Sequence, residues 1–228
     1  MKIISKVFKV FLPILLLGTA NLSAADCTHK IGSVLSLTGA YGAHGVPISR
    51  AAQMGVEHVN EARKQLGVGC DLVYDVRDSN TQASVAVDAA RKLIDIEGVT
   101  ALVGPISSGI TAPLLSSVTV EKNVVVVATA STSSTFTNMG KRGETKGLFF
   151  RTLPADALQA VAAAIMAYNA GFRRPSILYW NNDWGKNNKT EFVEAFKALG
   201  GEIAQTVPFN PDQASYRAEI TKSLEGNP

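Results

Sequence analysis

The chain has 228 residues, of which 46% are hydrophobic and 18% charged, a composition typical of a globular protein with one large core or two small ones. Its formal charge of +3 comes from Lys2, Lys6 and Lys9, since the remaining residues include 19 basic and 19 acidic side chains. A neutral chain without a basic stripe gives no sign of a nucleic-acid partner.

Residues 1–25 have the pattern of a cleaved export signal. The three lysines precede an apolar run over 10–17, and Ser23-Ala24-Ala25 supplies the small residues that a signal peptidase reads. The run is too short to span a bilayer, which disfavours an uncleaved anchor. Asp26 before Cys27 departs from a lipobox, so we do not expect lipidation. We expect a signal peptide at 1–25 and a periplasmic protein.

Two cysteines, Cys27 and Cys70, each lie just before a predicted strand. In an exported protein this placement favours a disulfide between neighbouring strand starts, with two unpaired thiols as the alternative. His29, His44 and His58 make no metal-ligand spacing with them, so no metal site is expected.

Strands and helices alternate through the first two thirds of the chain. Strands are expected at 31–37, 70–76, 101–103, 123–127 and 148–152, and helices at 47–66, 82–97 and 110–120. The Ser/Thr-rich stretch 128–135 is predicted to be a loop. Sustained alternation of this kind favours a parallel sheet with helices on both faces.

The same alternation restarts after residues 152–156. A helix is expected at 157–170, then a strand at 176–180, a helix from the Asn181–Gly185 turn to about 199, a strand at 203–207 and a helix at 213–224. We interpret the restart as a passage between an N-terminal lobe, 26–153, and a second lobe, 154–228. No strand follows the last helix, so we expect the second lobe to be incomplete and the chain to be part of a longer protein.

Two loops at one sheet edge form the candidate site. The first, 104–109, follows a buried strand and precedes a helix, where free backbone N–H groups favour a small anion. The hydroxyl-rich loop 128–135 leaves the neighbouring strand at the same edge, where open α/β sheets bind ligands. A plain solvated loop is the alternative for such a Ser/Thr cluster.

Several kinds of catalytic site are not indicated. Gly39, Gly42 and Gly45 are spaced G-x-x-G-x-x-G, which is not the dinucleotide-binding fingerprint. The sequence has no G-x-S-x-G hydrolase motif and no G-x-x-x-x-G-K-[ST] phosphate loop. With few histidines and two cysteines expected to be bridged, pairs of nucleophile and base are scarce. We therefore expect neither catalysis nor a cofactor.

The chain resembles the branched-chain amino-acid-type solute-binding proteins of ABC importers, which are type I periplasmic binding proteins. The resemblance rests on short motifs that occur in the family's order over nearly all of the chain after residue 25: Ser36-Leu37-Thr38-Gly39-Ala40-Tyr41-Gly42 with Gly45, Asp78-Ser79 with Ala83, Val103-Gly104-Pro105, Ser107-Ser108, the loop from Ala128 to Thr132, Phe150-Arg151-Thr152 with Asp156, and Asp183-Trp184-Gly185. It implies an α/β fold of two lobes that close on a small solute.

The resemblance also implies a set of ligand-binding residues. Ser108 would bind a ligand carboxylate, Ala130 would offer its carbonyl to an α-ammonium group, and Thr132 would contact both. Tyr41 and His44 would lie at an aromatic wall, although His44 could equally be a solvated loop residue.

Two further residues come from the second half of the chain. Trp184 matches an aromatic position that covers the ligand, with simple packing as the alternative. Asp156 lies at the lobe crossover and could instead serve only as a helix N-cap. The family's ammonium-binding acid is expected beyond residue 228.

The function implied by the resemblance is the binding of an amino acid or a related small carboxylate or amide, and its delivery to an ABC permease in the inner membrane. The alternatives are a ligand-binding sensory lobe of a receptor on the same fold and, third, a secreted α/β enzyme. Fold alone does not separate them.

Overall fold

The computed structural model describes residues 27–228, so the signal peptide predicted at 1–25 lies outside the described residues. Five parallel strands form the first sheet, in the order β2-β1-β3-β4-β5. They are β1 (Thr28–Leu35), β2 (Asp71–Asp78), β3 (Ala101–Val103), β4 (Val125–Ala128) and β5 (Phe149–Arg151). The predicted parallel arrangement is confirmed for this part of the chain.

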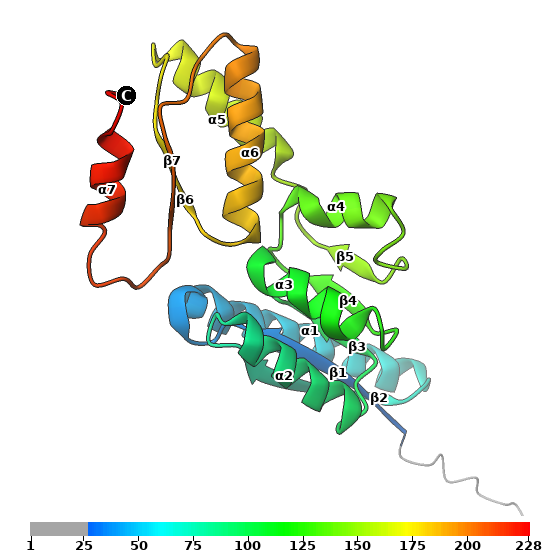
Figure 1. Cartoon of the computed structure of the whole chain (residues 1–228). Helices are drawn as coiled ribbons and strands as arrows, with labels where there is room; N and C mark the ends of the chain where they lie inside the picture. The colour runs from blue at the N-terminus through cyan, green and yellow to red at the C-terminus, as the bar shows by residue number, and fades with distance from the viewer. Residues whose placement is uncertain (1–26) are drawn as a thin grey trace, which may run out of the picture.

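Helices cover both faces of this sheet (Figure 1). On one face Val34, Leu102 and Val126 pack in the main core with α2 (Ala83–Asp95) and α3 (Ser108–Leu114), which continues as the π-helix η2 (Leu115–Thr119). On the other face α1 (Gly42–Leu66) covers Ile31 and Val103, with a cavity of about 300 Å³ between them. Burial of apolar side chains on both sides explains why these strands read as continuous hydrophobic runs.

A second, two-stranded parallel sheet is formed by β6 (Ile177–Trp180) and β7 (Thr206–Phe209). The chain reaches it through the segment between β5 and α5 (Ala157–Asn169), which contains the predicted lobe boundary at 153/154. Helix α5 packs along α6 (Asp183–Ala198), while α7 (Arg217–Leu224) packs on β7 and β6. Figure 1 shows α6 and α7 on opposite sides of the two strands.

The predicted disulfide between Cys27 and Cys70 is confirmed. The two residues precede β1 and β2, which pair directly, and the Asp71 N–H donates to the Cys27 carbonyl at 2.9 Å. His29 lies beside the two sulfur atoms. Because both sulfurs are bonded to each other, neither is available as a thiolate ligand for a metal ion. Within residues 27–228, no helix is both long and apolar enough to cross a membrane.

Two helix predictions were wrong in the first sheet's half of the chain. Helix α1 begins at Gly42, not at Pro47, because Gly45 lets its first turn lie against the end of β1. A Cβ added at Gly45 would lie 1.8 Å from the Ser36 carbonyl oxygen. Helix α4 (Ser134–Lys141) was not predicted; the Ser133 hydroxyl caps it, and buried Phe136 packs on Phe149 with ring centroids 4.8 Å apart.

In the second half, β7 and α7 are shifted from their predicted bounds. β7 covers 206–209 rather than 203–207, because its register with β6 begins at Thr206. α7 begins at Arg217 rather than at residue 213, because Gln213 belongs to a turn. Its side-chain carbonyl accepts from the Asn210 N–H at 2.8 Å, and Asp212 before it has a φ of +60°.

Candidate functional site

The loop between β3 and α3 presents two serines at the carboxyl edge of the first sheet. Ser107 is the N-cap residue of α3, in extended conformation, and Ser108 opens the helix with only 2% of its surface exposed. The backbone N–H groups of Ser108 and Gly109 donate to no atom of residues 27–228. They are therefore available to a ligand, as expected at the start of a helical segment.

The loop between β4 and α4 is fastened to this first loop by hydroxyl groups. The Ser131 and Thr111 hydroxyls lie 2.6 Å apart, and the Ser131 hydroxyl also reaches the Pro105 carbonyl at 3.2 Å. The Ser133 N–H donates to the Ser108 hydroxyl at 3.2 Å. Much of the hydroxyl-rich run thus serves to hold two loops in one geometry, which preorganises the groups that face the cavity beside them.

Arg151 supports the second loop from β5. Its guanidinium donates to the Ser133 carbonyl at 2.9 Å and to the Thr137 hydroxyl at 2.6 Å. Burial lowers the pKa of this guanidinium, and the nearby Asp156 carboxylate partly opposes that effect. The arginine remains cationic at neutral pH because the ordinary pKa of a guanidinium lies far above neutral pH.

Asp156 joins the two sheets at the cavity. One of its carboxylate oxygens, Oδ2, accepts from the Thr132 hydroxyl and, at 2.6 Å, from the Trp184 indole N–H. Asp156 is the N-cap residue of α5, but its side chain makes no capping hydrogen bond to that helix. The second oxygen, Oδ1, makes no hydrogen bond within the described part of the chain and is free to accept from a cation or an N–H donor.

Tyr41 and Trp180 bring the two sheets together beside this cavity. Their rings stack with centroids 5.1 Å apart, Tyr41 coming from η1 (Gly39–Tyr41) and Trp180 from the end of β6. Burial raises the pKa of the Tyr41 phenol, which stays protonated and able to donate. A further bridge links the Thr135 hydroxyl to an Asp183 carboxylate oxygen at 3.3 Å.

A cavity of about 270 Å³ lies between these elements and contains six of the seven predicted site residues. It is lined by Tyr41, Ile106, Ser107, Ser108, Ala130, Thr132, Leu153, Asp156, Gln159 and Trp184. His44 is the exception: it lies on the exposed side of the first turn of α1, since residues from Gly42 onward are helical rather than a loop. Its ring remains near Tyr41, with centroids 6.2 Å apart.

Gln159 is the polar lining residue that sequence reasoning missed. It lies in the first turn of α5, directly after the predicted crossover between the two sheets. This position lets its side chain face the cavity between them. Ser107 also lines the cavity, although only Ser108 of the Ser107-Ser108 motif was predicted to bind the ligand. The adjacent serines at 107 and 108 are the sequence feature that identified this loop.

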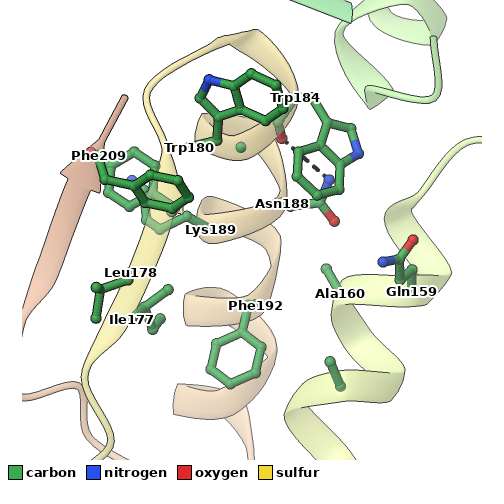
Figure 2. A pocket seen from close by; sticks show the side chains of 13 residues that line it. Gln159, Ala160, Ile177, Leu178, Trp180, Trp184, Asn188, Lys189, Phe192 and Phe209 are labelled. Atoms are coloured by element: carbon green, nitrogen blue, oxygen red, sulfur yellow. Dashed lines mark hydrogen bonds between the residues drawn. The ribbon is translucent and has the colours of Figure 1, made fainter. Parts of the chain in front are cut away.

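A second, mostly apolar cavity of about 320 Å³ adjoins the first within the β6–β7 half (Figure 2). Figure 2 shows Trp180 and Trp184 at one end and Phe192 farther along α6, with Gln159 and Ala160 opposite on α5. The Asn188 amide donates to the Trp184 carbonyl at 3.2 Å, a contact within α6. Trp184 and Gln159 line both cavities, so Trp184 packs as well as facing the first cavity.

Comparison with known proteins places this geometry in a family. A model described as periplasmic binding protein matches residues 28–228. The chain belongs to the periplasmic binding protein family. Relatives named Leu/Ile/Val-binding protein match the chain, in agreement with the group that its motifs resemble.

Three relatives illustrate the similarity. The Leu/Ile/Val-binding protein BraC3 of Rhizobium johnstonii is 33% identical over 211 residues, which are 90% of this chain and 53% of that protein. The chemotactic signal transduction system substrate-binding protein BasB of Halobacterium salinarum is 30% identical over 206 residues, 87% of this chain and 48% of that protein. The crystal structure of the leucine binding protein LivK of Thermotoga maritima superimposes with a TM-score of 0.69 and 25% identity, covering 88% of this chain and 54% of LivK. The chain thus spans about half the length of these relatives.

Proposed function

We propose that this periplasmic binding protein is the solute-binding component of an ABC importer. It binds an amino acid, or a related small carboxylate or amide, between two lobes in the periplasm and delivers it to the permease in the inner membrane, without catalysis. The observation that carries the proposal is the single cavity at which Ser108, Ala130 and Thr132 from the first sheet meet Trp184 from the second half.

The chemistry of the cavity suits a ligand that carries a carboxylate and an ammonium group together. The free N–H group and the hydroxyl of Ser108 would bind the carboxylate. On the other side, the Ala130 carbonyl and Oδ1 of Asp156 would accept from the ammonium. Each charge-assisted hydrogen bond of this kind contributes about 1.5–3 kcal/mol.

Asp156 is our candidate for the carboxylate that accepts from the ligand's ammonium group. The family's ammonium-binding acid was expected beyond residue 228, yet a carboxylate already lines the cavity from the crossover segment. Because Asp156 also receives hydrogen bonds from Thr132 and Trp184, it connects a first-sheet loop to α6. Ligand binding beside it would close the two lobes about the segment 152–156, which is a hinge between them.

Calorimetry with single-residue variants tests the proposal. Thermal-shift screening of L-amino acids and small carboxylates is expected to find at least one stabilising ligand. Ser108→Ala and Thr132→Ala should each weaken its binding by about tenfold or more, since each removes one hydrogen bond to the ligand. Ser117→Ala, an exposed serine of η2 outside the cavity, is the matched control and should bind normally. Unchanged affinity in both site variants would refute the site assignment.

A sensory role is the second candidate, and the similarity to BasB favours it. In that case the closed, ligand-bound form would dock on a signalling receptor instead of a permease. Deletion of the gene would separate the two roles: an importer subunit is needed for uptake of the labelled ligand, whereas a sensor is needed for the behavioural response with uptake intact.

A further inference from the structure

Besides the cavity of the proposed site and the apolar cavity that adjoins it, a third cavity, of about 420 Å³, lies between the two halves of the chain and has no role in the proposed site. Its lining comes from the loops after β1, β2, β3, β6 and β7: Gly39, Ala40, Asn80, Thr81, Gln82, Ala83, Ser107, Gly109, Ile110, Trp180, Asn182, Pro211 and Asp212. Ser107 also lines the cavity of the proposed site. Tyr41 lines the cavity of the proposed site and Trp180 lines the third cavity. Because their rings stack, the two cavities are neighbours.

The start of α2 supplies hydrogen-bond donors to this polar cavity. Gln82, the N-cap residue, makes no side-chain cap, and the N–H group of Ala83, which lines the cavity, donates to no atom within residues 27–228. α2 has 13 residues, so its N-terminus carries the usual partial positive charge. An acceptor or a single negative charge is favoured at that position.

Ser107 is an independent sign that a ligand belongs here. Only 6% of its surface is exposed, and its hydroxyl makes neither a capping bond nor any other hydrogen bond with the described residues. Because Ser107 lines the cavities and its hydroxyl has no partner among the described residues, that hydroxyl can donate to a ligand there and accept from one. Ser107 lines both cavities, so a ligand that extends from one cavity into the other would pass its unpaired hydroxyl.

The charged residues of the lining limit which ligands this cavity can bind. The lining has no Lys, Arg or His, and its only charged member is the exposed carboxylate of Asp212. A multiply charged anion such as phosphate would find no counter-charge and would be repelled by Asp212. A single carboxylate or a carboxamide is matched by the N–H groups of α2 and by the Asn182 amide.

We propose that this third cavity is a second subsite, and that the ligand is an amino acid extended through its carboxyl group, the simplest form being a dipeptide. The inference rests on the proposed function, in which the ligand carboxyl group lies at Ser108. In a dipeptide the N-terminal residue occupies the first cavity and the peptide carbonyl takes the place of the carboxylate at Ser108. The C-terminal carboxylate continues past Ser107 to the start of α2.

The test is isothermal titration of the full chain with matched pairs of probes. Each branched-chain or aromatic L-amino acid is compared with its glycine-extended dipeptide, for example L-leucine with L-leucylglycine. The proposal predicts at least one dipeptide that binds about tenfold or more tightly than its parent amino acid. If amino acids bind and every dipeptide binds equally or more weakly, the second subsite is refuted and the proposed function stands. If no probe of either kind binds, both fail.

Charge variants locate the second carboxylate. Gln82→Glu places a negative charge at the start of α2 and should lower the ratio of dipeptide to amino-acid affinity by about fivefold, whereas Asp212→Asn should raise it. Gln53→Glu, on the exposed face of α1 outside every cavity described above, is the matched control and should leave both affinities unchanged. A ratio that is the same in Gln82→Glu and in the unmodified chain would overturn the placement.

Discussion

The contact between Gly109 and Asn182 offers a sharp test of the arrangement of the two halves. Gly109 lies in the first turn of α3, and Asn182 is the N-cap residue of α6. A Cβ added at Gly109 would lie 2.9 Å from the Asn182 Cβ, closer than carbon atoms approach in folded proteins. Gly109→Ala therefore forces a displacement at this contact, although its backbone conformation accepts alanine without strain.

The displacement has a calculable cost because Asn182 is not free to move. Its side-chain oxygen accepts from the Gly185 N–H at 2.8 Å and caps α6. Moving the side chain gives up a cap of about 1 kcal/mol, and separating the halves instead gives up the Tyr41–Trp180 stack, of about 0.5–1.5 kcal/mol. Either way the closed arrangement loses about 1 kcal/mol, so ligand affinity should fall about fivefold.

The assay is calorimetric titration combined with thermal unfolding. Alanine is a better helix former than glycine, so the melting temperature of the unliganded Gly109→Ala protein should be unchanged or higher while affinity falls. Adding Asn182→Gly, which removes the opposing Cβ and costs the cap only a few tenths of a kcal/mol, should restore most of the affinity. Unchanged affinity in Gly109→Ala, or no recovery in the double variant, would refute the contact as a determinant of closure.

Three predictions concern stability. Burial alone would raise the pKa of Asp78, but hydrogen bonds from the Thr38 hydroxyl and three backbone N–H groups lower it. Its stabilising effect is thus present above the ordinary Asp range near 3.9 and is lost as pH falls through the lower folded-state pKa, so Asp78→Asn should flatten this acid limb in pH-dependent denaturant melts. Gly45→Ala should unfold the chain or cost more than about 3 kcal/mol in urea melts, because no space exists for the Cβ. Replacing Cys27 and Cys70 by serine should cost about 2–4 kcal/mol, since the bridge closes a loop of 43 residues; a smaller loss in the same melts would contradict the chain-entropy argument.

The sequence predicted the structure best where apolar runs are long and where residues with a strong turn preference bound them. The parallel strands, the crossover after β5 and the Cys27–Cys70 pair follow from hydrophobic runs and from the position of each cysteine before a strand. Helix α4 escaped detection because it has only eight residues and its hydroxyl-rich start resembles a loop. Its decisive feature, the packing of Phe136 on Phe149, is a tertiary contact that local patterns do not reveal.

The site was predictable to the extent that it lies at strand ends. Ser108, Ala130 and Thr132 follow neighbouring strands, and parallel strands bring their carboxyl ends to one edge. His44 was misplaced because three glycines suggested a loop where α1 begins. The free Oδ1 of Asp156 and the cavity at the start of α2 depend on how the two halves meet, which no periodicity encodes.

Hydrogen–deuterium exchange with and without a binding solute tests the central claim most directly. If one small molecule binds between the two halves, segments from both must become protected together as the ligand saturates. We expect protection of 106–110 and 130–133 in the first half and of 183–188 at the start of α6. Protection confined to one half, with affinity demonstrated by calorimetry in the same sample, would contradict the account.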